Sequence, residues 1–125
     1  MSRKILYVED NPQNMRLVRK MIDGHYEVLE ALNGAFGLSL AISEKPDLIL
    51  MDINLPDIDG LEVTARLKAI PDTAHIPVIA LTANAMYGDR ERFLAGGCDG
   101  YLAKPITRIE LLNTLTHHLN RCRTS

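Results

Sequence analysis

The stretch PDLILMDINLP, residues 46–56, is the part of the chain that determines the fold. Within it, four apolar residues at positions 48–51 follow a proline and run directly into a carboxylate, Asp52. A short apolar run with these boundaries predicts a strand that is buried on both faces, in the middle of a parallel sheet. Open sheets of this class bind ligands at the carboxyl ends of their strands. The sequence therefore places Asp52 where a side chain can leave the core and do chemistry.

Length and composition indicate one domain over residues 1–125. The chain has 125 residues, enough for a core that needs no disulfide bond. Its two cysteines, Cys98 and Cys122, lack the spacing of a metal site and are typical of reduced thiols in the cytosol. The formal net charge is −2, and no apolar run approaches the ~20 residues of a membrane span. We expect a cytoplasmic protein that binds neither nucleic acid nor membrane.

Short apolar runs alternate with amphipathic segments along the whole chain. Besides the central strand, we expect strands at residues 4–8, 27–31, 77–82 and 100–103. Each strand is followed by a segment with helical spacing of apolar residues, which indicates a parallel sheet with helices on both faces. We therefore expect an α/β fold: a doubly wound, five-stranded parallel sheet with five helices and the flavodoxin-like strand order 2-1-3-4-5.

Each expected helix has a start signal or an apolar stripe. Helix starts are indicated by Asn11 before Pro12, Asn33 before Gly34, Asp59 with Glu62, and Thr107 with Glu110. A fourth helix, at residues 86–95, has more charge and a thin apolar face. The residues expected on the buried stripes of the others are Met15, Val18 and Ile22; Phe36, Leu40 and Ile42; Val63, Leu67 and Ile70; and Ile109, Leu112, Leu115 and Leu119.

Polar residues stand at the carboxyl ends of four of these strands. They are Glu9 and Asp10, Asp52, Thr82, and Lys104. Strand ends are often polar simply because loops begin there, and this explains any one of these residues. It explains poorly why three carboxylates, one hydroxyl and one ammonium all meet at one edge.

A cluster of carboxylates needs positive charge. Two of them about 4 Å apart repel by about 4 kcal/mol at an effective dielectric of about 20. Lys104 supplies one positive charge, and Mg²⁺, which prefers a few carboxylates plus phosphate oxygens, is the natural second. A carboxylate is itself a nucleophile toward phosphorus and forms an aspartyl phosphate. Thr82 and Lys104 are then placed to contact phosphoryl oxygens.

Four motifs resemble the receiver domain of bacterial two-component response regulators. They are VEDN at 8–11, LMDINLP at 50–56 followed by Asp59-Gly60, ALTA at 80–83, and YLAKPI at 101–106. Each is a weak pattern alone, but in this order and at strand ends they are highly specific, and the resemblance covers essentially the whole chain. Residues 85–101 are most similar to DivK-type single-domain cell-division regulators, and also to the receiver domains of hybrid kinases.

The resemblance implies a magnesium site. Asp52 would be the phosphoacceptor. Asp10 and Asp52 would bind Mg²⁺ directly, and Glu9 would act mainly through water. Asn54 would add its backbone carbonyl.

The resemblance also implies a phosphoryl site and a switch. Thr82 and Lys104 would bind the phosphoryl group, and the Lys104–Pro105 peptide bond would be cis. Tyr101 would be the aromatic switch residue whose rotamer responds to Thr82. Phosphorylation would then change a surface made of helix 86–95, strand 100–103 and the last helix.

We therefore expect a phosphorylation-gated signalling switch rather than an enzyme. A sensor histidine kinase or a histidine phosphotransfer protein would supply the phosphoryl group, and a downstream protein effector would read the switch. The protein would be a monomer or weak dimer. An alternative is a receiver domain cut from a hybrid kinase or a multidomain regulator.

Three further alternatives have less support. A phosphatase with an aspartate nucleophile usually carries a second Asp two residues on, where this chain has Asn54. A nucleotide or flavin site would need a phosphate-binding loop after the first strand, but Glu9 and Asp10 repel phosphate there. A receiver that serves only as a binding scaffold would normally have lost its acceptor or its lysine, and this chain keeps both.

Overall fold

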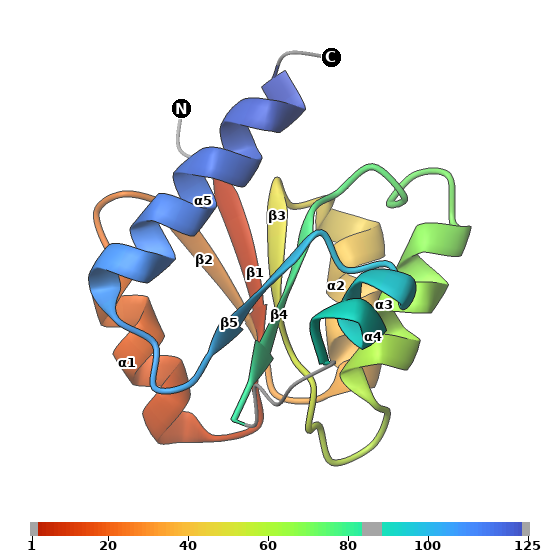
Figure 1. Cartoon of the computed structure of the whole chain (residues 1–125), viewed down its shortest axis with the longest axis horizontal. Coiled ribbons are helices and arrows are strands. Elements are labelled where there is room, and N and C mark those ends of the chain that lie inside the picture. The colour runs from red at the N-terminus through yellow and green to blue at the C-terminus, as the bar shows by residue number, and fades with distance from the viewer. Residues whose placement is uncertain (1–2, 84–88, 124–125) are drawn as a thin grey trace.

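A five-stranded parallel sheet with the order β2-β1-β3-β4-β5 forms the centre of the molecule (Figure 1). The computed structural model describes residues 3–83 and 89–123. The strands are β1 (Lys4–Val8), β2 (Glu27–Ala31), β3 (Leu48–Asp52), β4 (Val78–Thr82) and β5 (Gly100–Ala103). The predicted fold class, strand order and strands are confirmed. β4 begins one residue later than expected because Pro77 has no N–H for the ladder, although its carbonyl accepts from Ile49 N at 2.9 Å.

Helices cover both faces of the sheet. On one face lie α1 (Pro12–Ile22) and α5 (Arg108–Arg123), and on the other lie α2 (Gly34–Glu44), α3 (Gly60–Ala69) and α4 (Asp89–Ala95) (Figure 1). The first residues of the helix expected at 86–95 lie outside the described residues. Within the ranges that are described, no helix combines the length and the apolar character needed to cross a bilayer.

Side-chain caps begin the helices close to the carboxyl ends of the strands. The Asn11 side chain accepts from Gln13 N and Asn14 N, and the Asn33 side chain accepts from Phe36 N. Asp59 caps α3 in the same way, through Leu61 N. These caps confirm the predicted starts of α1, α2 and α3.

The core has two layers, one on each face of the sheet. β3 is buried at all of its residues, as its apolar sequence predicted. Alternate residues of β1 and β3 point to opposite faces: Ile5, Tyr7, Leu48 and Leu50 face α1 and α5, whereas Leu6, Val8, Ile49 and Met51 face α2 and α3. This burial fixes the ends of β1 and β3 next to each other.

The predicted buried stripe of α2 is wrong at two of its three positions. Phe36 and Ile42 are exposed, whereas Leu40 is partly buried against the core. The helix buries Gly34, Gly37 and Ala41 instead. The reason is the close approach of α2 to the sheet: a Cβ atom on Gly37 would lie 2.7 Å from Val8 Cγ2. Small residues are therefore required on the inner face.

Two further helix predictions need correction. In α5, Ile109 is 73% exposed, and Leu111 is buried in its place, in register with Leu115 and Leu119. Leu112 is only partly buried. Ile70, expected inside α3, caps the helix after Ala69 and is half-buried.

Candidate functional site

Three carboxylates meet at the carboxyl edge of β1 and β3. Val8 and Met51 are register partners in neighbouring strands, so Glu9 and Asp52 follow side by side. One oxygen each of Glu9, Asp10 and Asp52 lies within 4.8 Å of the others. Glu9 is 1% exposed and Asp52 is 3% exposed, whereas Asp10 lies open to solvent. The fold thus assembles the acidic cluster that the sequence predicted.

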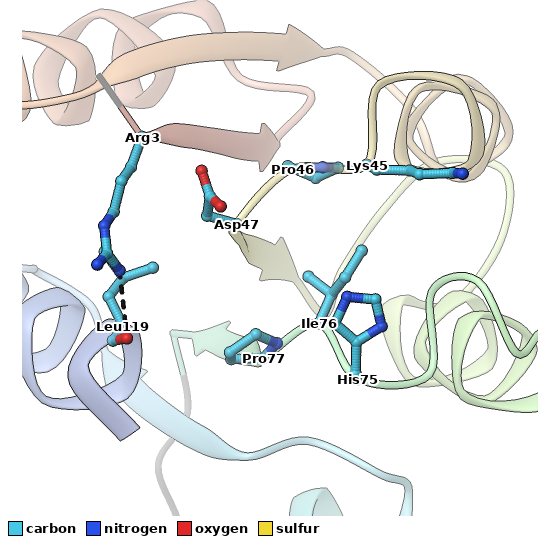
Figure 2. A pocket seen from close by; sticks show the side chains of 8 residues that line it. All are labelled: Arg3, Lys45, Pro46, Asp47, His75, Ile76, Pro77 and Leu119. Atoms are coloured by element: carbon cyan, nitrogen blue, oxygen red, sulfur yellow. Dashed lines mark hydrogen bonds between the residues drawn. The ribbon is translucent and has the colours of Figure 1, made fainter. Parts of the chain in front are cut away.

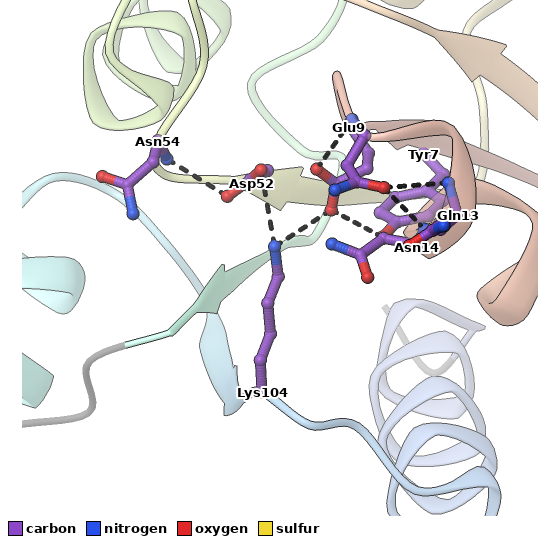
Figure 3. Close-up of polar contacts among 8 residues, drawn as sticks. Tyr7, Glu9, Gln13, Asn14, Asp52, Asn54 and Lys104 are labelled. Atoms are coloured by element: carbon purple, nitrogen blue, oxygen red, sulfur yellow. Dashed lines mark hydrogen bonds and ion pairs between the residues drawn. The ribbon is translucent and has the colours of Figure 1, made fainter.

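Lys104 reaches this cluster from the end of β5 (Figure 3). Its Nζ atom lies 3.0 Å from Glu9 Oε1 and 3.5 Å from Asp52 Oδ2. The backbone holds it in place, because Lys104 N donates to the carbonyl of Thr82 at 2.8 Å. The peptide bond from Lys104 to Pro105 is cis. The lysine therefore supplies the counter-charge expected for the carboxylates.

A buried tyrosine, Tyr7, also contacts the cluster. Its hydroxyl donates to Glu9 Oε1 at 2.9 Å, while Asn11 N donates to Glu9 Oε2 at 3.3 Å. Burial, followed by the negative charge of Glu9, raises the pKa of Tyr7 far above its ordinary value, so the phenol stays a neutral donor. Sequence reasoning missed Tyr7, although residues two apart on a strand share a face.

The loop after β3 holds Asp52 in place. Asn54 N donates to Asp52 Oδ1 at 3.1 Å, and Gly60 N donates to the carbonyl of Ile53 at 3.0 Å. A Cβ atom on Gly60 would lie 2.3 Å from the Asp52 carbonyl oxygen, so only glycine fits at this position. The structural reason for this glycine was not visible in the sequence.

The surroundings of the two buried carboxyl groups lower the pKa of Glu9 and raise the pKa of Asp52 from their ordinary values. Burial, and then the hydrogen bond and negative charge of Glu9, raise the pKa of Asp52 to about 7. Burial also acts to raise the pKa of Glu9, but hydrogen bonds with Asp52 and Lys104 outweigh it and lower that pKa. The pair of carboxyl groups therefore binds its last proton more tightly than an exposed aspartate would, and a cation bound nearby would displace that proton.

Thr82 and Tyr101 occupy different parts of this region. Thr82 ends β4 and is 4% exposed, with Ala103 as its partner in β5. Tyr101 pairs with Ala80, two positions before Thr82, and is 37% exposed. Its ring lies 5.9 Å from the ring of Phe93 in α4, measured between centroids. Tyr101 thus contacts α4 and does not belong to the acidic cluster.

A cavity of about 350 Å³ lies at the opposite, amino end of the strands (Figure 2). Two of its polar side chains bind backbone groups of neighbouring elements: Arg3 Nη1 donates to the carbonyl of Leu119 in α5 at 3.2 Å, and Asp47 Oδ2 accepts from Lys4 N in β1 at 2.8 Å. It is lined by Arg3, Lys45, Pro46, Asp47, His75, Ile76, Pro77 and Leu119. The carboxyl edge, with its clustered charges, is therefore the candidate site.

Known proteins resemble this chain over most of its length. Residues 5–116 match the family described as the response regulator receiver domain. The polar-differentiation response regulator DivK of Brucella anthropi is 48% identical over 120 residues, which cover 95% of this chain and 98% of that protein. DivK of Brucella ovis is 47% identical with the same coverage.

Solved structures show the same fold. The receiver domain of sensor histidine kinase PA1611 from Pseudomonas aeruginosa PAO1 has a TM-score of 0.89 and 39% identity, with 96% of this chain and 99% of that chain covered. It was solved with a magnesium ion coordinated in its active site cleft. Chemotaxis response regulator CheY4 of Vibrio cholerae has a TM-score of 0.88 and 28% identity, with 94% and 99% covered.

Proposed function

Because this chain belongs to the family of response regulator receiver domains, we propose that Asp52 is its phosphoacceptor and that residues 1–125 act as one receiver domain. One observation carries the proposal: Glu9, Asp10 and Asp52 lie within 4.8 Å of one another, and Lys104 lies 3.5 Å from Asp52 Oδ2. Asp52 is the member of this cluster that ends the buried central strand, and it is held by both a backbone donor and a lysine. It is therefore positioned as a nucleophile.

The reaction is phosphoryl transfer to a carboxylate. An oxygen of Asp52 forms a bond to phosphorus, and the bond from phosphorus to the donor's leaving atom breaks. Lys104 turns its ammonium toward the transferred group, and the hydroxyl of Thr82 donates to another phosphoryl oxygen. The chain itself serves as acceptor and assists only its own phosphorylation and dephosphorylation, so it is a switch and not an enzyme acting on other substrates.

The carboxylates fit Mg²⁺. They offer hard oxygen donors close together, and the buried pair, Glu9 and Asp52, carries charge that a cation would neutralise. Asp10 and Asp52 would bind the ion directly, Glu9 through water, and Asn54 through its backbone carbonyl. Bound there, Mg²⁺ supplies positive charge for the phosphoryl oxygens. The magnesium in the similar PA1611 receiver domain supports this assignment.

Partners follow from the family. A sensor histidine kinase or histidine phosphotransfer protein supplies the phosphoryl group, and a downstream effector binds the surface of α4, β5 and α5. The similarity to DivK supports a role in cell division or polar differentiation. We place the protein in the cytoplasm as a monomer or weak dimer, with no nucleic acid or membrane as partner.

A receiver domain of a hybrid kinase is the second candidate. It is favoured by the 39% identity to the receiver domain of sensor histidine kinase PA1611. The DivK relatives favour a stand-alone regulator more strongly, at 48% identity over 98% of their length.

Phosphorylation with a small phosphodonor tests the proposal. Incubation with acetyl phosphate and Mg²⁺ should add the mass of one phosphoryl group to the wild type. Asp52→Asn should remove this gain, and so should chelation of Mg²⁺. Asp72→Asn, which alters an exposed aspartate paired at 4.0 Å with Lys45, is the control and should be labelled like the wild type. Labelling that persists in Asp52→Asn would refute the assignment.

A further inference from the structure

We propose that Tyr7 is a positioning residue that keeps the Glu9 carboxylate in place when Lys104 turns to the phosphoryl group. This inference rests on the proposed function of Asp52 as acceptor. Tyr7 lies in the core, two residues before Glu9 in the chain. The hydroxyl of Tyr7 and the ammonium of Lys104 both donate to the same atom, Glu9 Oε1, at 2.9 Å and 3.0 Å (Figure 3).

Glu9 needs permanent donors because it is 1% exposed. When a buried carboxylate loses its hydrogen bonds, nothing compensates the free-energy cost of removing it from water. Lys104 is a temporary donor, since its charge is also needed at Asp52 Oδ2, 3.5 Å away. If Lys104 were the sole donor to Glu9 Oε1, its movement would leave that oxygen without a hydrogen bond. The hydroxyl of Tyr7 keeps Glu9 Oε1 hydrogen-bonded when Lys104 moves away.

The Tyr7 side chain is fixed, whereas the Lys104 side chain has room to move. Tyr7 is fully buried and packs in the core layer formed with α1 and α5. Lys104 has a flexible stem, and its side chain is 21% exposed. A cavity of about 70 Å³ lies between the two side chains and is lined also by Asn14, Leu17 and Ile106. The rigid ring is thus suited to hold Glu9, and the lysine is suited to change partner.

The proposed positioning of the Glu9 carboxylate depends on the hydroxyl of Tyr7 and not on its aromatic ring. Tyr7 and Glu9 are two positions apart along the strand direction, so their side chains leave the same face. A phenylalanine at position 7 would fill the same space in the core but would donate nothing to Glu9. Tyr7→Phe therefore separates the positioning role from packing.

The test is Mg²⁺ titration by calorimetry without phosphodonor, combined with phosphorylation rates at saturating Mg²⁺. Tyr7→Phe should weaken Mg²⁺ binding severalfold, less than the about tenfold lost when a hydrogen bond to a direct metal ligand is removed, because Glu9 would hold the ion through water. It should also slow phosphorylation by acetyl phosphate at saturating Mg²⁺. Tyr26→Phe is the matched control, because Tyr26 packs against the same core layer just before β2, at the amino end of the sheet. It should keep wild-type values in both measurements.

A double substitution distinguishes positioning from packing. In a Glu9→Ala background, Tyr7→Phe should not weaken Mg²⁺ binding further, because the substituted side chain has no oxygen to accept from the Tyr7 hydroxyl. An equal loss in both backgrounds would overturn the inference, as would wild-type behaviour of Tyr7→Phe. If the wild type binds Mg²⁺ in this Tyr7-dependent way but takes up no phosphoryl group, the proposed function fails and the link between Tyr7 and Glu9 remains.

NMR of the wild type gives a measurement that does not depend on a variant. On phosphorylation, the side-chain nitrogen signal of Lys104 should shift, while the hydroxyl proton of Tyr7 stays protected from exchange. Loss of that protection on phosphorylation would contradict the proposal.

Discussion

Glu9 and Lys104, 95 positions apart in the chain, form an ion pair with 3.0 Å between Oε1 and Nζ. The lysine lies farther from Asp52, at 3.5 Å from Oδ2. Before phosphorylation, the charge of Lys104 is therefore shared between two carboxylates, with Glu9 as the nearer partner. This arrangement leads to opposite expectations for metal binding and for phosphoryl transfer.

Replacing Lys104 with methionine should strengthen Mg²⁺ binding and weaken phosphorylation. The lysine neutralises part of the negative charge that attracts the cation, so at pH 8 Lys104→Met should bind Mg²⁺ about threefold to tenfold more tightly. Phosphorylation should fall at least about tenfold, because a charged donor to the phosphoryl oxygens is lost. Calorimetry and intact mass measure the two effects. Weaker Mg²⁺ binding in the variant would show that Lys104 organises the site and does not compete with the ion.

The acidic pair should make stability fall as pH rises. Asp52 holds its proton more tightly when folded, since its pKa is raised from 3.8 to about 7. The free energy of unfolding without Mg²⁺ should therefore decrease across that range and level off above it, by at most about 4 kcal/mol. The lowered pKa of Glu9 acts in the opposite direction, at pH values below its ordinary 4.5.

Urea unfolding of the wild type and Asp52→Asn between pH 4.5 and pH 8 measures this effect. An amide resembles the protonated acid, so the two proteins should be similarly stable at low pH, and Asp52→Asn should become the more stable one near neutral pH. A difference that does not change with pH would exclude the raised pKa of Asp52.

Gly60→Ala should damage the site through the backbone. The added Cβ would lie 2.3 Å from the Asp52 carbonyl oxygen, so the start of α3 or the end of β3 must shift, at a cost of about 1–3 kcal/mol. Phosphorylation of Asp52 should fall even in the folded fraction. Gly24→Ala is the control: its positive φ of 86° makes it strained by about 1–2 kcal/mol, but nothing lies within 4 Å of the added atom. It should be phosphorylated like the wild type once folded.

Phosphorylation should change the surface around Tyr101. Thr82 is buried at the edge of the sheet, and Tyr101, on the neighbouring strand, is 37% exposed. Movement of Thr82 toward a phosphoryl group would vacate space into which Tyr101 turns. Amide exchange in residues 89–119 should change on phosphorylation of the wild type, and much less in Thr82→Ala. Equal responses in the two proteins would mean that Thr82 does not transmit the signal.

The elements of this fold follow from local sequence patterns. The apolar run before Asp52 predicted a strand buried on both faces, and β3 is buried throughout. Asn11 and Asn33 predicted the starts of α1 and α2, because a cap depends on residues within one turn. The stripe Met15, Val18 and Ile22 was also predicted correctly, since α1 packs through long side chains.

The spacing of apolar residues gave wrong predictions where the packing of a helix on the sheet decides which side chains are buried. The spacing of Phe36, Leu40 and Ile42 suggested an apolar face for α2, but that helix lies so close to Val8 that Gly37 must face inward. In α5, Ile109 and Leu111 are equally apolar, and the orientation of the helix on β1 and β3 buries Leu111. Hydrophobicity alone does not specify helix orientation.

Sequence alone determined which chemical groups reach the carboxyl edge, because every strand of a parallel sheet ends there. Asp52 and Thr82 are the last residues of their strands, and Glu9 and Lys104 directly follow theirs. The folded arrangement decided how they pair. That Lys104 lies nearer to Glu9 than to Asp52, and that Tyr7 donates to Glu9, depends on ångström-scale distances between elements far apart in the chain. Local patterns carry no information on such distances, since they are set by how the side chains of the two core layers pack against the sheet.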